Sequence, residues 1–348
     1  MDTEFITEGK MGYYKLLPTA QIIYDKMGAS VVDMLTFEKI NYSYNESIVL
    51  KRLLECESKD FELLEEKEKD LIANLMAAGY CYYYKGLAYN DIHRDKKAVE
   101  VRGLMEEIPH FTEIFLEVND VAEPTESTGG PENHRGCYAC KAWPHRSGIR
   151  KKYDFENAIS RIAKLWVDKL VLTGENPFAR TERLKEMVTC IRKYMEPIPI
   201  EVITPVMNPE AEILSFLENN NVSVRLYADN ASLEDNSYAN RINRRNPDYW
   251  NNQTFHHCLK NKLAITADGF VRPCPMIDDD LLDLEKDPID RLFQEQRLDK
   301  YWRLTKREIE GCSKCRNRYF CKDCALTELA VKNGILKHEV FCIGKAER

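Results

Sequence analysis

The sequence predicts an α/β protein in which a middle region of alternating strands and helices follows a small mixed module and precedes a cysteine-rich segment. Two observations lead to this prediction. Apolar runs of strand length alternate with helical stripes between residues 111 and 227, and seven of the 12 cysteines fall within residues 258–342. Hydrophobic residues make up 44% of the 348 residues, which is enough for ordinary buried cores.

Residues 1–90 have the pattern of a winged-helix-like module, with strands, helices and a final small wing. The expected elements are a strand at 21–24, a turn at Gly28, helices at 45–54 and 71–76, a C-cap at Gly79 and a hairpin of residues 80–84 and 87–89 around Lys85-Gly86. This segment carries ten Lys and Arg but fifteen Asp and Glu, a balance of −5. Phosphate binding needs the opposite sign, so DNA is not the expected partner, and a structural cap is the alternative role.

The middle region alternates strands with helices, which implies parallel β/α units. Strands are expected at 114–118, 170–173, 200–204 and 222–227, and helices at 155–166, 184–191 and 209–217, with Trp166 closing the first helical stripe. This length suffices for about half of an eight-unit barrel of ~250 residues, so a partial barrel or a short open sheet is expected. The polar, Asn-rich residues 229–254 predict a crossing loop or a linker.

Charge and hydropathy favour a soluble cytoplasmic protein. The formal net charge of −7 gives no attraction to nucleic acid or to an anionic membrane surface. No apolar run approaches the ~18 residues of a membrane span, and the first residues lack the pattern of a secretory signal. A reducing cytoplasm rarely keeps structural disulfides, so a dense cysteine cluster there more often binds metal.

The distal cysteines are regularly spaced. Cys312, Cys315, Cys321 and Cys324 form C-x2-C-x5-C-x2-C, preceded by Cys258 and Cys274 and followed by Cys342. A C-x2-C pair places two sulfurs on one tight turn, so that both can reach one metal centre. Thiolates suit tetrahedral zinc and the irons of a cluster equally well, so the spacing alone leaves both metals open.

This segment resembles the SPASM domain, the auxiliary iron–sulfur module at the carboxyl end of radical-SAM peptide maturases. The likeness includes Gly269-x4-Cys274, Tyr301-Trp302 and the block of residues 312–324 with its linking residues. Two departures are the x2 gap before Cys324, where many members have x3, and the absence of a cysteine just before Cys258, where residues 251–253 are Asn-Asn-Gln.

The resemblance implies two [4Fe–4S] clusters. One would be held by Cys312, Cys315, Cys321 and Cys342, and the other by Cys258, Cys274 and Cys324. The second set leaves one iron open to water, to substrate or to a nearby histidine, His256 or His257.

The resemblance also implies a radical-SAM-like core, but two signatures of its chemistry are degenerate. The family's C-x3-C-x2-C is reduced to Cys137 and Cys140, with Asn133 in place of the first cysteine, and Asn is a poor substitute for thiolate on iron. The Gly-Gly-Glu-Pro motif, which binds the amino group of S-adenosylmethionine, is replaced by Gly174, Glu175, Asn176 and Pro177, with the acidic residue out of register. A pseudo-radical-SAM protein that does not cleave S-adenosylmethionine is therefore expected.

Cys137 and Cys140 admit other interpretations. A cluster completed by His134, a zinc site with His134 and His145, a redox dithiol and a packing remnant all remain alternatives. Three further cysteines lie in apolar patterns and are expected in the core, namely Cys56, Cys81 and Cys190.

The expected function is that of an iron–sulfur protein in the maturation of a ribosomally made peptide. Three domains are expected: a peptide-recognition module (1–105), a degenerate partial barrel (106–254) and a SPASM domain (255–348). The first resembles, in pattern and position, the leader-peptide recognition element of such systems, which adds the peptide as a strand to a sheet edge. The protein would act as a scaffold or electron-transfer accessory for a catalytic maturase such as a radical-SAM enzyme or an ATP-grasp ligase. The alternatives are an active radical-SAM/SPASM peptide oxidoreductase and a zinc-stabilised interaction or transcription module.

Overall fold

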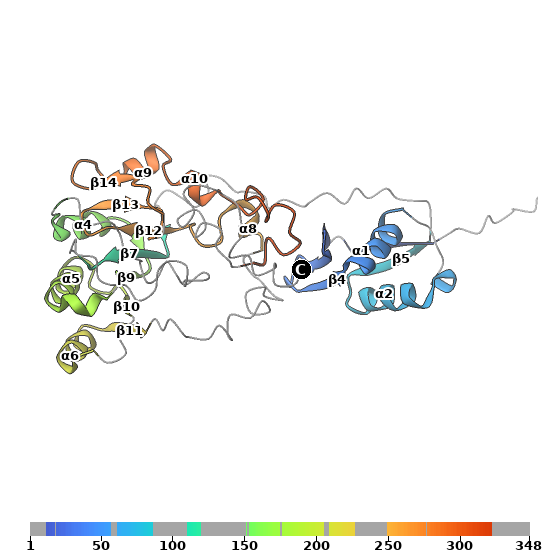
Figure 1. The fold of residues 1–348 in the computed structure, drawn as a ribbon, viewed down its shortest axis with the longest axis horizontal. Coiled ribbons are helices and arrows are strands. Elements are labelled where there is room, and N and C mark those ends of the chain that lie inside the picture. Colours follow the sequence, from blue (N-terminus) through green and yellow to red (C-terminus); the bar gives the residue numbers. More distant parts are fainter. Residues whose placement is uncertain are drawn as a thin grey trace, which may run out of the picture. The chain divides into compact units, whose positions relative to one another are not determined.

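The computed structural model describes residues 12–17, 19–56, 61–85, 110–119, 151, 153–174, 176–204, 209–226, 249–275 and 277–321. These residues form two compact units, whose elements are labelled in Figure 1. The first takes the described residues among 1–98, 242–253 and 312–321, and the second takes the others. No helix in these ranges has the length and apolar character that crossing a bilayer requires.

A three-stranded antiparallel sheet forms the centre of the first unit. Its order is β2 (Ala20–Asp25), β3 (Gly28–Asp33) and β4 (Lys39–Ser43), which leaves β4 at one edge among the described strands. The turn between β2 and β3 ends at Gly28, whose φ is +141°. A Cβ atom there would lie 2.0 Å from the carbonyl oxygen of Tyr42, so the close approach of β4 excludes any larger residue.

Helices follow the sheet. A capping box of Ser43 and Glu46 starts α1 (Tyr44–Lys51), which continues as a π-helical turn η1 (Arg52–Cys56). A short 3₁₀ turn η2 (Phe61–Leu63) precedes α2 (Glu66–Ala77), and Gly79, at φ +72°, ends that helix as predicted.

The predicted final hairpin has a different pairing in the described residues. Residues 80–84 do form a strand, β5 (Cys81–Lys85), and it pairs antiparallel with β1 (Gly12–Leu16). The expected partner at residues 87–89 lies outside the described part of the chain. Cys81 is buried as predicted, and burial raises the pKa of its thiol to about 12. Cys190 is half-buried against the core of the second unit, whereas the side chain of Cys56 lies outside what is described.

The second unit confirms the predicted alternation of parallel strands and helices. Its parallel strands are β7 (Glu113–Glu117), β9 (Leu170–Thr173), β10 (Ile200–Thr204) and β11 (Val222–Leu226), separated along the chain by α4 (Phe155–Ile162), α5 (Thr181–Tyr194) and α6 (Ala211–Asn219). All residues of β9 and β10 are buried, as expected for parallel strands covered on both faces. The fold is therefore mixed α/β with a parallel sheet.

The prediction for Trp166 is wrong. The helix ends at Ile162, and Trp166 lies in the short strand β8 (Trp166–Val167), which pairs with β6 (His110–Phe111). Its side chain is 61% exposed, and its ring is tilted against the His110 ring with 5.0 Å between the ring centres. The apolar ring extends the helical pattern in the sequence but does not enter the core.

The same sheet also takes up strands from the cysteine-rich part of the sequence. β12 (Lys262–Ile265) pairs parallel with β7 on the side opposite β9, and β13 (Phe270–Arg272) and β14 (Leu282–Asp283) extend it antiparallel. The described residues also include three short helices: α8 (Asn251–Thr254), α9 (Arg291–Gln294) and α10 (Asp299–Trp302). The boundary of the three-domain division at residue 254 stays a prediction, but strands on both of its sides share this sheet.

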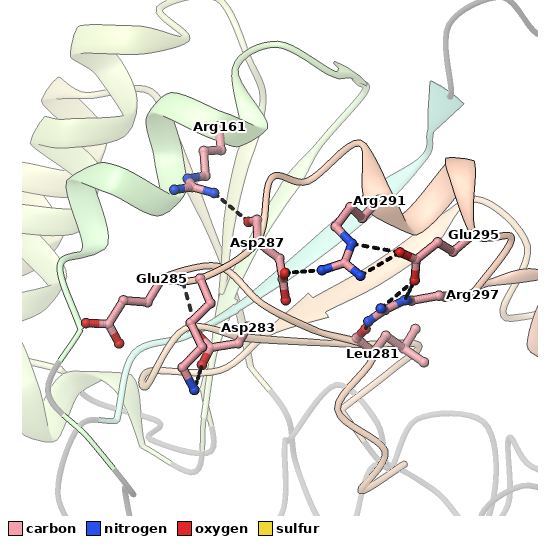
Figure 2. Close-up of polar contacts among 9 residues, drawn as sticks. Arg161, Leu281, Asp283, Glu285, Asp287, Arg291, Glu295 and Arg297 are labelled. Atoms are coloured by element: carbon pink, nitrogen blue, oxygen red, sulfur yellow. Dashed lines mark hydrogen bonds and ion pairs between the residues drawn. The ribbon is translucent and has the colours of Figure 1, made fainter.

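Charged side chains join the distal segment to α4 (Figure 2). Arg161 of α4 donates a hydrogen bond to the carbonyl oxygen of Asp287 at 2.6 Å. Arg291 forms ion pairs with Asp287 and Glu295, and Arg297 reaches the same Glu295 carboxylate at 2.5 Å. These contacts fix the loop after β14 against the first crossover helix of the sheet.

A row of alternating charges runs across the parallel strands, beginning at the amino ends of β12 and β7. Lys262 pairs with Glu113, Glu113 with Lys169, Lys169 with Glu201, and Glu201 with Arg225, at N–O distances of 2.6 to 3.1 Å. Burial raises the pKa of Glu113, but Lys262 and Lys169 outweigh it and lower that pKa from 4.5 to about 2.

We expect this row to make stability depend on acidity. Because the folded-state pKa of Glu113 is depressed, its contribution is present above pH 4.5 and is lost as the pH falls towards 2. Glu113→Gln should cost about 2 kcal/mol at pH 6, after a discount for the partly exposed lysines, and about a quarter of that near pH 2.5. Urea unfolding across this range measures the difference. The exposed Glu218→Gln is the control, and an equal cost at both pH values would contradict the assignment.

Candidate metal centre

The first C-x2-C pair forms the tight turn that its spacing predicts. The backbone N–H of Cys315 donates to the carbonyl oxygen of Cys312 at 2.9 Å, which closes the turn. The N–H of Asn317 then donates to the Sγ atom of Cys315 at 3.4 Å. An N–H···S bond favours the thiolate over the thiol, because it places a donor where negative charge develops. Cys321 follows within the same turn-rich segment, its N–H bonded to the carbonyl oxygen of Asn317 at 2.9 Å.

Arg316, between the cysteines, ties this turn to the three-stranded sheet. Its Nη1 atom donates to the carbonyl oxygen of Tyr42 in β4 and, at 3.4 Å, to that of Ala29 in β3. Its backbone N–H donates to Oδ2 of Asp25 at 2.8 Å. Because Arg316 is only 9% exposed, these carbonyl groups replace the water that its guanidinium would otherwise bind.

Lys39 approaches the cysteines from β4. Its Nζ atom donates to Oδ1 of Asn317 at 2.5 Å and lies 4.7 Å from the centre of the Phe320 ring. The side chain is 7% exposed. Burial lowers the pKa of Lys39 to about 7, while Cys315 and Cys321 oppose this shift and Arg316 adds to it.

An aromatic cluster holds the turn in place. Tyr249, Tyr319 and Phe320 are fully buried. The ring centre of Tyr249 lies 5.4 Å from that of Tyr319 and 5.2 Å from that of Phe320. The Tyr249 hydroxyl donates to Oε1 of Gln21 in β2 at 2.7 Å, and Nδ2 of Asn252 donates to the carbonyl oxygen of Tyr319 at 2.8 Å. Residues from three distant parts of the sequence therefore pack as one core around the cysteine turn.

The second predicted site lies in the other unit, around Cys258 and Cys274. Cys274 is buried with Leu259 and Ile277, beside Tyr301 and Trp302. The pKa of Tyr301 is raised by burial and further by Asp279 and Cys274. The surroundings of Cys274 are therefore largely apolar, and Tyr301 is influenced by both this thiol and the carboxylate of Asp279.

His256 is placed differently from what a metal ligand requires. Its Nδ1 atom accepts hydrogen bonds from the N–H groups of Cys258 and Leu259, at 3.1 and 3.2 Å. Burial lowers its pKa to about 4, so the ring is neutral, and these bonds assign the proton to Nε2. Nε2 is buried and has no hydrogen-bond partner in the described ranges. His256 therefore caps the turn that carries Cys258, and its Nε2–H group could donate a hydrogen bond but could not act as a metal ligand in this tautomer. His257 stacks on this ring, 4.7 Å between centres.

The donor types fit a thiolate-bound metal, but Cys312, Cys315 and Cys321 are all described and are not gathered as a metal-holding group, and the second set has only two described members. No three His, Cys, Asp or Glu side chains in these ranges come together as a metal-holding group. Cys324 and Cys342, one predicted member of each set, lie outside them. The N–H···S bond at Cys315, the buried cation of Lys39 and the orphaned Nε2 of His256 are the features that suit a negatively charged sulfur centre.

The third predicted cysteine pair cannot be placed. Cys137 and Cys140 lie outside the described residues, as do Asn133, His134 and His145. All interpretations of this pair therefore stay predictions.

The degenerate glycine motif lies at the carboxyl end of β9, where α/β sheets commonly bind ligands. Gly174 has φ +124°, and a Cβ there would lie 3.3 Å from Cγ of Glu117 at the end of β7. Oδ1 of Asn176 accepts from the N–H of Phe178 at 3.1 Å and so caps η3 (Pro177–Arg180). Glu175 is outside the described part. Asn176 thus has a local structural task that explains its presence without a ligand.

Sequence reasoning missed Lys39 and Arg316. Arg316 lies between two cysteines of the predicted metal-binding block, but the sequence does not indicate that its side chain binds backbone carbonyl groups of the three-stranded sheet. Lys39 is 278 residues from Asn317, and no local pattern distinguishes it from other strand lysines.

Comparisons with known proteins give weak similarities. No family model and no curated protein matches the chain. Among solved structures, Streptococcus suis SuiB bound to the precursor peptide SuiA is 10% identical, with 94% of this chain and 99% of that chain covered and a TM-score of 0.41. BtrN in complex with AdoMet and 2-DOIA is 13% identical, with 63% and 95% covered and a TM-score of 0.40. Both TM-scores lie below 0.5, so neither alignment establishes a shared fold.

Proposed function

We propose that this chain is an iron–sulfur protein that binds the leader segment of a precursor peptide along β4 and supports the modification of that peptide. The observation that carries the proposal is the packing of a sheet edge and a cysteine turn within one compact unit, through Lys39 and Arg316. Peptide binding and metal binding would then take place on adjoining parts of one core.

The β4 edge is suited to strand addition. The two-residue turn before Gly28 pairs that glycine with Asp25. The backbone N–H of Asp33 donates to the carbonyl oxygen of Glu38, just before β4 begins. In an antiparallel ladder the bonded positions alternate, so the backbone groups of Lys39 and Asn41 point away from β3. An extended peptide could pair with these groups by main-chain hydrogen bonds, as in other edge-strand recognition.

The parallel sheet supports the other half of the proposal. It supplies the β/α units expected of a radical-SAM-like partial barrel, and the first unit supplies the sheet, helices and β5 expected of a winged-helix-like recognition element. With Asn176 used as a helix cap, the glycine motif keeps its backbone turn but lacks an aligned acidic residue for an amino group. A pseudo-radical-SAM scaffold or electron-transfer accessory in the cytoplasm, acting with a separate catalytic maturase, is the function we propose.

Metal analysis after anaerobic purification tests this proposal. We expect iron and acid-labile sulfide close to two [4Fe–4S] clusters per chain, about eight irons in all. Zinc without sulfide would contradict the proposal and favour a zinc-stabilised interaction module. The same preparation, reduced with dithionite and incubated with S-adenosylmethionine, should release no 5′-deoxyadenosine above a protein-free control. Release above that level would instead identify an active radical enzyme.

A further inference from the structure

We propose that Lys39 is a positioning residue of the metal centre at Cys312, Cys315 and Cys321: its ammonium group holds the turn through Asn317 and balances the charge of the sulfur ligands. This inference rests on the proposed thiolate centre, and it assigns a role to a residue of the N-terminal sheet rather than to a further ligand. It also links the edge strand β4 to the state of the metal.

A short chain of hydrogen bonds joins Lys39 to a sulfur atom. Nζ of Lys39 donates to Oδ1 of Asn317 at 2.5 Å, and the N–H of the same Asn317 donates to Sγ of Cys315 at 3.4 Å. Asn317 is 3% exposed, so both of its contacts are shielded from water. A change in charge at the sulfur therefore reaches Lys39 through one intervening residue.

The buried ammonium group of Lys39 and the nearby guanidinium group of Arg316 favour a negative charge close to them. Its side chain is buried, it lies above an aromatic ring, and the nearby Arg316 carries the same sign. Among the described residues, Cys315 and Cys321 act on it with the opposite sign. A buried ammonium group is costly unless a negative partner is close, and thiolates bound to metal supply that partner permanently.

Two consequences follow from this arrangement. A fixed positive charge favours the deprotonated thiols that metal binding needs, so it strengthens metal affinity. It also stabilises an added electron, so it raises the reduction potential of a cluster bound there. Since Lys39 belongs to β4, loading the metal should in turn order the edge strand.

Lys39→Met tests the inference, because methionine keeps the length and removes the charge. The full chain is reconstituted with ferrous iron and sulfide, and the potentials of its clusters are titrated by electron paramagnetic resonance. We expect a more negative potential for one cluster only, the other serving as an internal reference. Cobalt(II) titration of the apoprotein should show roughly 10- to 100-fold weaker binding at one site.

Three controls keep the result interpretable. Lys39→Arg retains the charge and should retain most of the potential and the affinity. Lys26→Met removes an exposed lysine from the turn of the same sheet and should change neither. Lys39→Gln, which can still donate a hydrogen bond to Asn317, covers the case in which the methionine variant does not fold.

The inference is overturned if Lys39→Met, or Lys39→Gln in its place, matches Lys26→Met in both potential and cobalt affinity. The cobalt titration needs no iron–sulfur cluster and no peptide. It therefore separates a failure of this inference from a failure of the proposed function.

Discussion

Asn41→Pro is expected to weaken peptide binding by about 100-fold, which corresponds to about 2.7 kcal/mol. The backbone N–H of Asn41 faces the open side of β4, so proline removes one donor to an added strand, and its ring obstructs the approach of that strand. The pairing with β3 uses the neighbouring positions, so the sheet itself should persist. Peptides selected on the wild-type full chain from a display library of random sequences provide the probe, with affinities measured by fluorescence anisotropy.

The matched control for this prediction is Asn41→Ala. Both substitutions lose the bond from Ser30 Oγ to Oδ1 of Asn41, which is 2.6 Å long, but alanine keeps the backbone donor. We expect the alanine variant to bind within about threefold of wild type. Equal losses for both variants would place the effect in the side chain, and no loss for proline would remove β4 as the binding edge.

Local patterns in the sequence predict much of the fold. Buried parallel strands are continuous apolar runs, so Leu170–Thr173 and Ile200–Thr204 were predicted at their observed bounds. Gly79 marks a helix end because an αL position there favours glycine. These features depend on residues within a few positions of each other, so they can be predicted from a single sequence.

The parts that could not be predicted depend on partners far apart in the sequence. β12 returns to pair with β7 after nearly 150 residues, and β1 pairs with β5 across two helices. An edge strand can pair with any strand that has a suitable hydrophobic pattern, so the sequence alone does not indicate which strand becomes its partner. The Trp166 error has a related cause, since an apolar residue in helical register need not face the core.

The candidate site divides in the same way. Cysteine spacing indicated the turn at Cys312 and Cys315, because two sulfurs on a short turn are a local property. The residues that contact this turn come from separate segments. Lys39 brings a positive charge to it through Asn317, and Tyr249, which is bonded to Gln21, packs against its aromatic side chains. The role of His256 also needed geometry, since only its hydrogen bonds distinguish a cap from a ligand.

Cys315→Ser should remove about four of about eight iron atoms per chain, the other cluster signal remaining. A serine hydroxyl is a far poorer iron ligand than a thiolate, and the loss also deprives the Asn317 N–H of its sulfur acceptor. Cys190→Ser is the control, because that half-buried thiol lies on α5 and belongs to neither predicted set. Iron and sulfide analysis measures both variants, and full iron in Cys315→Ser would refute the ligand assignment.

The same variant also tests whether metal and sheet are coupled. Without the centre, Lys39 loses its anionic partner while it stays enclosed by Phe320 and Asn317. Hydrogen exchange of β4 amides should therefore speed up in Cys315→Ser and not in Cys190→Ser, because the buried ammonium group is then relieved only by losing its proton or by opening of the edge strand. If iron is lost while exchange at β4 is unchanged, the metal is held beside the sheet without stabilising it, and peptide binding and metal loading would be independent properties of the unit.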